Sequence, residues 1–487
     1  MKRILCSFYS AAILLLAGLG YVQPVQAAGP VPVAVTVDYY SPGTPVSDLV
    51  FGTNIEWVDN GDNFWDPDLQ DFRPERIAAI AETHPTSIRF PGGVHADTYH
   101  WKQAVGPMAS RTAGQHYYKT EPVASNFGTD EFLKLCKRLN ARPVFTINII
   151  SGTPAEAAEW VQYVNTVSAQ NNYPAVLFWE IGNEPYLDNK IPRISPDVYV
   201  QKYLAFSQAI RQVDPAAPLG ALMVGQELEK QYVSKYTKGW NQVLLAQPGA
   251  VIDYGVLHNA YYPGFIWNPL TSTANVFNTA FSSVSKIKSD MTWLKTLTGT
   301  RPIKFFISEY NSFFGLNTRY DAYVSTLGGT LYMANVLQEF LGNPNITGAS
   351  YWSMFDNWYF GLVYGTVKRP NYYLFKLYSG LKGKFNIPVS PVAVSDLKLI
   401  AFKESGKIWI YAVNNNQTGS YQVKFTLKNF QPLSAGTIDT IYADSMLAGN
   451  ESGTEKVNIQ TAALAVTSPL LVTIKPHSIV LIKLNGQ

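Results

Sequence analysis

An alternation of two kinds of segment is the feature that most restricts how this 487-residue chain can fold. Between residues 49 and 356, short apolar runs alternate with longer segments whose apolar residues recur at helical spacing. The predicted strands are residues 49–57, 87–93, 143–150, 176–184, 218–224, 254–262, 304–311 and 349–355. Eight parallel strands separated by helices close into a (β/α)8 barrel. An open doubly wound sheet is the alternative, but the sequence offers no glycine-rich phosphate loop for it.

The segments between these strands carry the signals of helix starts. Several begin at Ser, Thr or Asp, or carry Pro in the first turn. The predicted helices are residues 74–84, 129–140, 154–170, 196–213, 284–297 and 321–342, a less clear one at 238–247, and one after the eighth strand at 369–385. The fold class is therefore α/β, with a (β/α)8 TIM barrel predicted over residues 49–387.

The last part of the chain, residues 388–487, has a different pattern. Polar and apolar residues alternate in runs such as "LKLIAFKE" and "SIVLIKLN". This alternation predicts a C-terminal antiparallel β-sandwich domain. Residues 28–48 contain a further strand-like run, "VPVAVTVDYY". We expect that strand to join the sandwich, which would make this domain discontinuous in sequence.

Residues 1–27 have the features of a signal peptide. Lys2 and Arg3 precede an apolar stretch at 11–20 that is too short to span a bilayer, and small residues lead to a cleavage site after Ala27. Cleavage would lower the formal net charge from +3 to +1, because it removes Lys2 and Arg3. Such a weak charge gives no indication of a nucleic-acid partner. We expect a secreted or periplasmic protein with no membrane segment after cleavage, in which Cys136 is a core residue.

Two glutamates end predicted strands of the barrel. Glu184 follows the fourth strand in "VLFWEIGNEP", and Glu309 follows the seventh in "KFFISEYN". The carboxyl ends of barrel strands build active sites, so the two carboxylates are expected to converge. Converging carboxylates suit glycoside hydrolysis, with retention of configuration at a separation of about 5 to 5.5 Å and inversion at about 6.5 to 9.5 Å. A single Asn-Glu pair after a strand is more often an ordinary polar loop, but two matched strand ends are harder to explain in that way.

The division of roles between the two glutamates has an electrostatic basis. A carboxyl group beside an ionised neighbour has a raised pKa and can act as an acid; once the neighbour is esterified, that pKa falls and the group can act as a base. The residue pattern alone leaves open which glutamate takes which role.

Several blocks of sequence together resemble glycoside hydrolase family 51, the α-L-arabinofuranosidases of the retaining clan A. These blocks are "VFGTNIEW", "SIRFPGG", "YHWKQAVGP", the segment from "NFGTDEF" to "WVQYVN", "WEIGNEP", "ISEYN" and "PHSIVLIKLN". The resemblance implies a barrel with a β-sandwich, no cofactor, and exo-acting removal of arabinofuranosyl residues from plant polysaccharides. It also implies that Glu184 is the acid/base and Glu309 the nucleophile of a double displacement.

The resemblance assigns further residues to substrate binding. Glu56 resembles a first-strand glutamate that holds sugar hydroxyls; the ordinary alternative is a surface carboxylate. Trp57, beside it, is also expected to contact the substrate. Arg89 resembles an arginine that keeps the nucleophile ionised, which is also compatible with a structural ion pair. Asn183 resembles an asparagine that hydrogen-bonds the sugar 2-hydroxyl.

Three further candidates come from the ends of later strands. His258 and Tyr261 fall where the family has a histidine and a tyrosine near the nucleophile, although the spacing leaves Tyr261 and Tyr262 as alternatives. A lone histidine is often a core residue with its hydrogen bonds satisfied. Trp352 ends the eighth strand and could form a sugar platform or pack in the core.

The sequence departs from the family pattern at two positions. Val94 stands where the family has an asparagine that touches the sugar, and Glu180 stands where an apolar residue or Cys is usual. Both departures leave the specificity open to a β-xylosidase, a β-glucuronidase, a β-D-galactofuranosidase or an endo-glycanase. A non-catalytic carbohydrate-binding protein is a further alternative.

Other hydrolytic chemistries lack their signatures in the sequence. The six histidines form no His-x-x-x-His spacing, so we predict no metal site and no cofactor. No Gly-x-Ser-x-Gly elbow of a serine hydrolase occurs. The implied partner is a glycan, and because members of the family are often oligomeric, a homo-oligomer is possible.

Overall fold

The computed structural model describes residues 29–187, 190, 192–226, 229, 238–258, 272–312, 323–356 and 360–487. The predicted signal peptide and the candidate Tyr261 lie outside the described residues. Among the residues that are described, no helix combines the length and the apolar character needed to cross a membrane.

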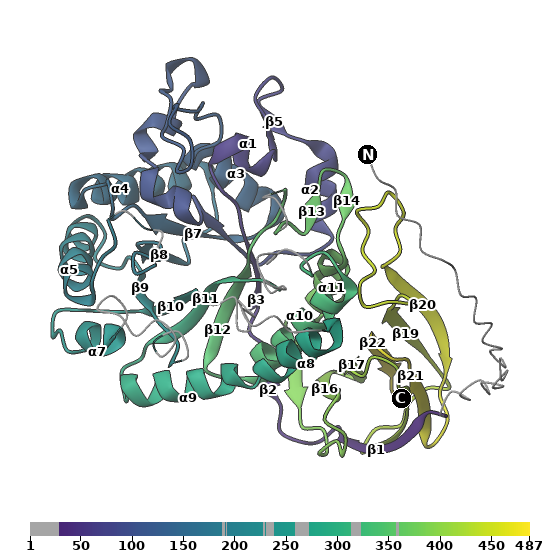
Figure 1. Cartoon of the computed structure of the whole chain (residues 1–487). Helices are drawn as coiled ribbons and strands as arrows, with labels where there is room; N and C mark the ends of the chain where they lie inside the picture. The colour runs from purple at the N-terminus through teal and green to yellow at the C-terminus, as the bar shows by residue number, and fades with distance from the viewer. Residues whose placement is uncertain are drawn as a thin grey trace, which may run out of the picture.

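Eight strands form a closed barrel in which every neighbouring pair is parallel (Figure 1). In chain order they are β3 (Leu49–Asn54), β6 (Ser87–Phe90), β7 (Arg142–Ile147), β8 (Phe178–Ile181), β9 (Leu219–Met223), β10 (Tyr254–His258), β11 (Lys304–Tyr310) and β12 (Ile346–Tyr351). Each coincides with one of the eight predicted runs, and β12 pairs with β3 to close the ring. The predicted TIM barrel is therefore confirmed.

Helices surround this barrel. They are α2 (Pro74–Ala81), α3 (Thr129–Leu139), α4 (Pro154–Asn171), α5 (Pro196–Val213), α7 (Trp240–Leu245), α8 (Thr273–Ser283), α9 (Lys286–Thr298), α10 (Leu327–Gly342) and α11 (Pro370–Tyr378). Helix α10 begins later than predicted because Thr326 caps it, accepting a hydrogen bond from the Gly329 amide. Helix α8 was not predicted, since its sequence is rich in Asn, Ser and Thr, which have weak helix propensity.

Short elements fill the connections. They are β2 (Thr44–Pro45), α1 (Val58–Asp62), β4 (Trp65–Asp66), β5 (Asp71–Phe72), η1 (Val94–Thr98), η2 (Trp101–Ala104), η3 (Met108–Ser110), β13 (Val363–Tyr364), β14 (Val367–Lys368) and η4 (Ser379–Leu381). Most of them lie in the loops that follow β3, β6 and β12, at the carboxyl ends of the strands.

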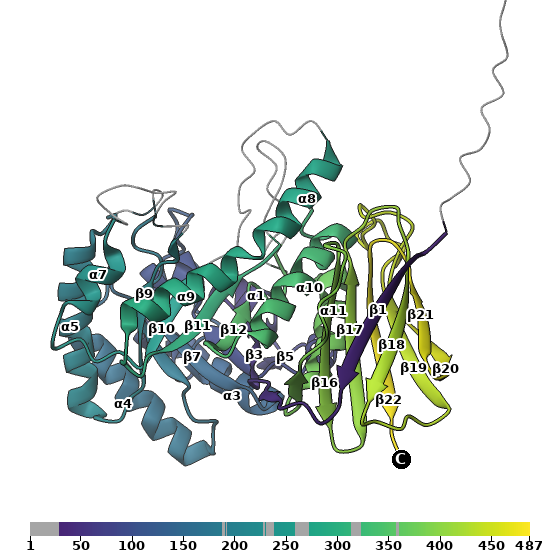
Figure 2. The ribbon, with the colours of Figure 1, turned by 90° about the horizontal axis from the view of Figure 1, so that it is seen from below.

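The C-terminal part forms a β-sandwich beside the barrel (Figure 2). One sheet has the order β2-β15-β16-β17-β22-β19-β20 and the other the order β1-β18-β21. The strands not yet given are β1 (Val31–Asp38), β15 (Phe385–Ile387), β16 (Leu397–Glu404), β17 (Lys407–Asn414), β18 (Tyr421–Lys428), β19 (Ala435–Ile441), β20 (Ile459–Ala465), β21 (Leu470–Ile474) and β22 (Ser478–Asn485). The β1–β18 pair is parallel, whereas the other pairs within these two sheets are antiparallel.

The sandwich is fixed to the barrel through α10 and α11. One face of the larger sheet packs into the barrel core, while its other face packs against the three-stranded sheet. At the joint, the side-chain amides of Asn335 on α10 and Asn415 exchange two buried hydrogen bonds of 2.8 and 3.0 Å. The Tyr411 hydroxyl on β17 donates to the Leu377 carbonyl of α11 at 3.0 Å. A buried polar contact of this kind fixes the relative position of the two layers.

Candidate active site

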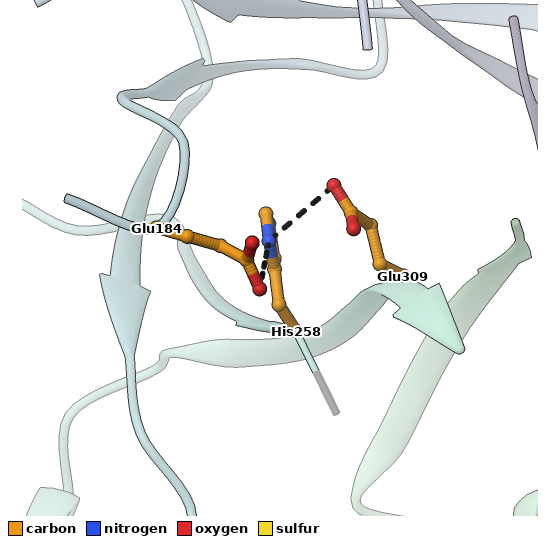
Figure 3. Close-up of side chains that lie close together, drawn as sticks. All are labelled: Glu184, His258 and Glu309. Atoms are coloured by element: carbon orange, nitrogen blue, oxygen red, sulfur yellow. Dashed lines mark ion pairs between the residues drawn. The ribbon is translucent and has the colours of Figure 1, made fainter. Parts of the chain in front are cut away.

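The two predicted glutamates converge at the carboxyl ends of the barrel strands (Figure 3). His258, at the end of β10, lies between them, and its Nδ1 is 3.5 Å from Glu184 Oε1 and 3.4 Å from Glu309 Oε1. One ligand atom from each of the three residues lies within 4.8 Å of the other two. The side chains of Glu184 and Glu309 are 20% and 17% exposed, whereas His258 is buried, so the carboxylates are the part of this cluster that solvent reaches.

Backbone geometry places these side chains. In the turn after β8, Gly182 has φ 98° and Glu184 has φ 45°, a left-handed conformation that is uncommon for a glutamate and is typical of functional sites. Strand β10 pairs with β11 so that His258 is opposite Glu309, with a register shift between Leu257 and His258. Two different local irregularities therefore direct Glu184 and His258 toward the same point.

Arg89, near the carboxyl end of β6, is the cation that connects these side chains. It is fully buried, and its Nη1 donates to Glu309 Oε1 at 2.7 Å. Its Nη2 donates to Asn183 Oδ1 at 2.9 Å, and its Nε donates to Glu180. In the part of the chain that the structure describes, the buried Nδ2 of Asn183 has no hydrogen-bond partner. Arg89 thus holds the oxygen of Asn183 and leaves its amide donors for another group.

Glu180 is a third carboxylate in this cluster and is fully buried. Its Oε1 is 2.7 Å from His258 Nε2 and accepts from the Ser308 hydroxyl at 2.9 Å. Its Oε2 accepts from Arg89 Nε and from the Thr146 hydroxyl, the latter at 2.8 Å. Burial alone would raise the pKa of Glu180, but the charges of Arg89 and His258 lower it to about 2.

The cations of the cluster are held in their charged forms. Burial would lower the pKa of His258, but the carboxylates of Glu309 and Glu180 raise it to about 9. Burial likewise opposes the charge of Arg89, and the same two carboxylates raise its pKa. His258 is therefore an imidazolium at neutral pH, with Nε2 bonded to Glu180 and Nδ1 facing Glu184 and Glu309.

The two exposed carboxylates have opposite pKa shifts. For Glu184, burial is outweighed by the contact with His258, so its pKa is lowered. For Glu309, burial and the charges of Glu184 and Glu180 outweigh His258 and Arg89, so its pKa is raised. For Glu184 to be protonated while Glu309 is ionised, the pKa of Glu184 would have to be the higher of the two. Direct contact with Arg89 nevertheless belongs to Glu309 and not to Glu184, and that contact favours the ionised form of Glu309.

Glu56 and Trp352 lie next to each other at the ends of β3 and β12. A Cβ added to Gly93 would come within 2.4 Å of the Trp352 ring and 2.9 Å of Glu56 Oε1, so both side chains pack against this glycine. Gly92 and Gly93 have φ of 67° and 52°. The left-handed backbone and this close approach both require glycine, which explains the "PGG" of the sequence. The Trp352 amide also donates to the carbonyl of Tyr310, the residue that follows Glu309.

Trp57, the residue after Glu56, is almost completely buried. Its ring is 1% exposed and packs against Tyr99 and Gly114, and its Nε1 donates to the His95 carbonyl at 3.2 Å. A ring buried in this way has no face for a sugar to stack on. Trp57 is therefore a core residue next to Glu56, and it is not available to contact a substrate.

The cluster contains residues that the sequence did not assign to the site. In the sequence, Glu180 stands out only as a departure from the pattern of the family that the chain resembles. Asn54 at the end of β3 accepts from Arg89 Nη1 at 3.2 Å, and its own amide donates to the Ser308 and Tyr351 carbonyls. The only sequence signal for Glu180 and Asn54 is a polar side chain at the end of an otherwise apolar strand.

The same cluster has donor atoms close enough together to bind a metal ion, namely those of Glu184, His258 and Glu309. The charges present fit that use poorly. Glu309 Oε1, the oxygen nearest to His258, already accepts from the Arg89 guanidinium, and His258 is itself a cation. A divalent ion at this point would meet two positive charges, so we interpret the cluster as an ion-pair network.

The sequence of this chain is similar to those of known alpha-L-arabinofuranosidases. Residues 79–259 match the family model described as alpha-L-arabinofuranosidase 1 domain, a range that includes Arg89, Glu180, Glu184 and His258. A probable alpha-L-arabinofuranosidase C of Aspergillus terreus is 30% identical over 201 residues, which cover 39% of this chain and 35% of that protein. An intracellular exo-alpha-L-arabinofuranosidase of Bacteroides ovatus is 26% identical over 306 residues, or 58% and 55% of the two chains. The chain thus matches about a third to a half of the length of these relatives.

The fold is shared more widely than the sequence. The crystal structure of the GH51 arabinofuranosidase from Xanthomonas axonopodis pv. citri superimposes with a TM-score of 0.78 at 18% identity, over 93% of this chain and 100% of that one. The barrel and the sandwich are both included at this coverage. The resemblance drawn from the sequence motifs is therefore confirmed in sequence and in fold.

Proposed function

This chain is similar in sequence and fold to the α-L-arabinofuranosidases of glycoside hydrolase family 51, and from that premise we propose that it is a retaining, exo-acting α-L-arabinofuranosidase. The carboxylates of Glu184 and Glu309 meet at the strand ends with oxygens within 4.8 Å of each other. Retaining enzymes hold their two carboxyl groups about 5 to 5.5 Å apart and inverting enzymes about 6.5 to 9.5 Å apart, and facing oxygens this close are compatible with the retaining arrangement.

In the first step, the carboxylate of Glu309 attacks the anomeric carbon while Glu184, as a carboxylic acid, protonates the leaving oxygen. The bond to the aglycone breaks and a covalent glycosyl ester forms on Glu309. In the second step, Glu184 as a carboxylate removes a proton from water, and the water oxygen displaces Glu309. The proton that Glu184 loses in the first step is regained in the second, so the enzyme returns to its starting state.

The surrounding residues have defined tasks in this proposal. Arg89 stabilises the ionised Glu309 and orients Asn183, whose unpartnered amide is directed to the sugar 2-hydroxyl. A hydrogen bond at that hydroxyl strengthens in the transition state. Glu56 holds other hydroxyls, and the Trp352 ring beside it offers an apolar face.

The experiment compares four aryl glycosides: α-L-arabinofuranoside, β-D-xyloside, β-D-glucuronide and β-D-galactofuranoside. We expect the arabinofuranoside to be cleaved with retention, and Glu309→Gln to lower kcat by more than about 1,000-fold. Glu156→Gln is a matched control, because Glu156 also binds a histidine, His100, away from this cluster. Cleavage of another glycoside with the same dependence on Glu309 would keep the mechanism and change the substrate. No cleavage of any of them, nor of plant arabinan or xylan, would overturn the proposal.

We also propose that the protein is exported, on the strength of the charged and apolar pattern of residues 1–27. The test is expression of the full chain in a bacterium, followed by sequencing of the N-terminus of the extracellular or periplasmic protein. The expected mature chain begins at Ala28. Recovery of uncleaved protein from the cytoplasm would contradict export.

A further inference from the structure

Glu180 has an unusual set of contacts for a buried carboxylate. Four donors surround its two oxygens, and they come from four different strands: Arg89 on β6, Thr146 on β7, His258 on β10 and Ser308 on β11. Every acceptor position is therefore used within the barrel. Glu180 itself has no exposed surface and cannot touch a substrate.

Both cations that bind Glu180 also face the reactive carboxylates. Arg89 uses Nε for Glu180, which leaves Nη1 for Glu309 and Nη2 for Asn183. His258 uses Nε2 for Glu180, which leaves Nδ1 for Glu184 and Glu309. A carboxylate that binds one nitrogen of an imidazole fixes the ring orientation and the proton on that nitrogen.

We propose that Glu180 is a positioning residue of the active site: it holds Arg89 and His258 so that their remaining N–H groups are directed at Glu309, Asn183 and Glu184. The inference rests on the proposed function for its catalytic consequence, but its structural consequence can be measured without activity.

This arrangement places one proton of His258 between the two reactive glutamates. With Nε2 bonded to Glu180, the second proton of the imidazolium is on Nδ1, between Glu184 and Glu309. Transfer of that proton from Nδ1 to Glu184 Oε1 breaks one N–H bond, forms one O–H bond, and leaves a neutral imidazole and a neutral carboxylic acid. His258 therefore carries the proton that Glu184 needs as an acid, and the positive charge of His258 lowers the pKa of Glu184.

Charged groups from each described element around His258 contribute to this state. They are Glu180 on β8, Glu184 in the following turn, Glu309 on β11, and Arg89 on β6, whose Nη2 is 3.4 Å from His258 Nε2. Three carboxylates oppose one guanidinium. Replacing Glu180 by neutral glutamine removes one of the three without removing volume, so the imidazolium should lose a large part of its stabilisation.

The test is NMR titration of protein labelled at the histidine rings, in wild type and Glu180→Gln. Only six histidines are present, and His258→Asn identifies the resonance of His258. We expect His258 to titrate near 9 in the wild type. In Glu180→Gln we expect its pKa to fall by about 2 units. In activity assays the same variant should lose about 10- to 100-fold in kcat, with KM changed less than about 3-fold.

Glu156→Gln is the control for both measurements. Glu156 is 2.9 Å from His100 Nδ1 and raises the pKa of His100, so this variant should shift His100 and leave His258 unchanged. A wild-type His258 that titrates at or below about 6.5 would overturn the proposal even if Glu180→Gln does not fold. An unchanged His258 pKa in a folded Glu180→Gln protein would also overturn it. Absence of glycosidase activity in the wild type would contradict the proposed function but would leave the titration result intact.

Discussion

Arg89 and Arg111 both have buried side chains that pair with carboxylates, and the two arginines are used differently. Arg111, in the loop before α3, makes a bidentate pair with Glu131 at 2.8 and 3.0 Å, and its remaining donors bind the Gly106, Ser125 and Asn126 carbonyls. Glu131 in turn accepts from the Gly128 amide at the start of α3. One cation meets one anion, and the guanidinium donors are all directed at protein oxygens.

Arg89 is shared among four acceptors, and its single positive charge faces two carboxylates. It contacts Glu180, Glu309, Asn183 and Asn54, while Glu184 stands nearby. Within the described residues, the neighbouring His258 Nδ1 and Asn183 Nδ2 are buried and lack hydrogen-bond partners. Burial of an ion pair therefore does not by itself indicate function. Function is indicated by buried donors without a hydrogen-bond partner, and by more carboxylates than one arginine can neutralise, next to the pair.

The largest expected difference between the clusters is in catalysis by their glutamates. Glu184→Gln should lower kcat by about 10³-fold for a glycoside with a poor leaving group, because general acid catalysis is lost. The loss in kcat/KM should be smaller for a dinitrophenyl glycoside, because its leaving group needs little protonation in the first step. Glu131→Gln should leave kcat unchanged, since Glu131 caps a helix away from the site. The measurement is kcat/KM, which reports the first step, over a series of leaving groups; a uniform loss of kcat/KM in Glu184→Gln would show that Glu184 is not the acid.

The second difference concerns the guanidinium fork. Arg89→Lys keeps a positive charge but cannot serve Glu180, Glu309 and Asn183 together, so kcat should fall by about 100-fold. Arg111→Lys should change kcat by less than about 2-fold, because Arg111 contacts none of these groups. Equal losses in the two variants, measured on protein shown to be folded by circular dichroism, would contradict the distinction between the clusters.

Replacement of Arg111 should change the stability of the protein, although it hardly changes kcat. Arg111→Lys breaks a bidentate pair and several bonds to carbonyl oxygens, and we expect it to lower the free energy of unfolding by about 2 kcal/mol. Urea denaturation followed by fluorescence measures this value. A variant as stable as the wild type would mean that the Arg111 cluster contributes nothing as a bidentate pair.

Much of this architecture follows from local pattern. All eight barrel strands and both strand-end glutamates could be predicted, because apolar runs and their polar ends are visible in one dimension. Burial of Trp57 could not be predicted, since an aromatic at a strand end serves equally well as platform or as core. Helix α8 was missed because its burial of Phe277 and Val276 overrides weak local propensity.

The network around Glu180 could not be predicted for a different reason. Strand β8 is buried on both faces, so the sequence "FWEI" does not show which residues face the barrel interior. The partners of Glu180 lie on strands separated by between 34 and 128 residues in sequence. Only closure of the barrel brings them together, and therefore the charge balance of the site is a property of the tertiary structure.

The last predicted effect is a pH dependence of stability that belongs to the Arg89 cluster. His258 has a pKa of about 9 in the folded protein, against about 6.5 for an unperturbed histidine. Its stabilising contribution is fully present below the lower value and is lost as the pH rises through the higher one. Between these values, the folded state binds one more proton, so the free energy of unfolding should fall by about 1.4 kcal/mol per pH unit. Urea denaturation from pH 7 to 9 measures this slope. Glu180→Gln should flatten it and Arg111→Lys should retain it, because only the first variant removes a charge that holds the proton; identical slopes in wild type and Glu180→Gln would show that His258 does not carry it.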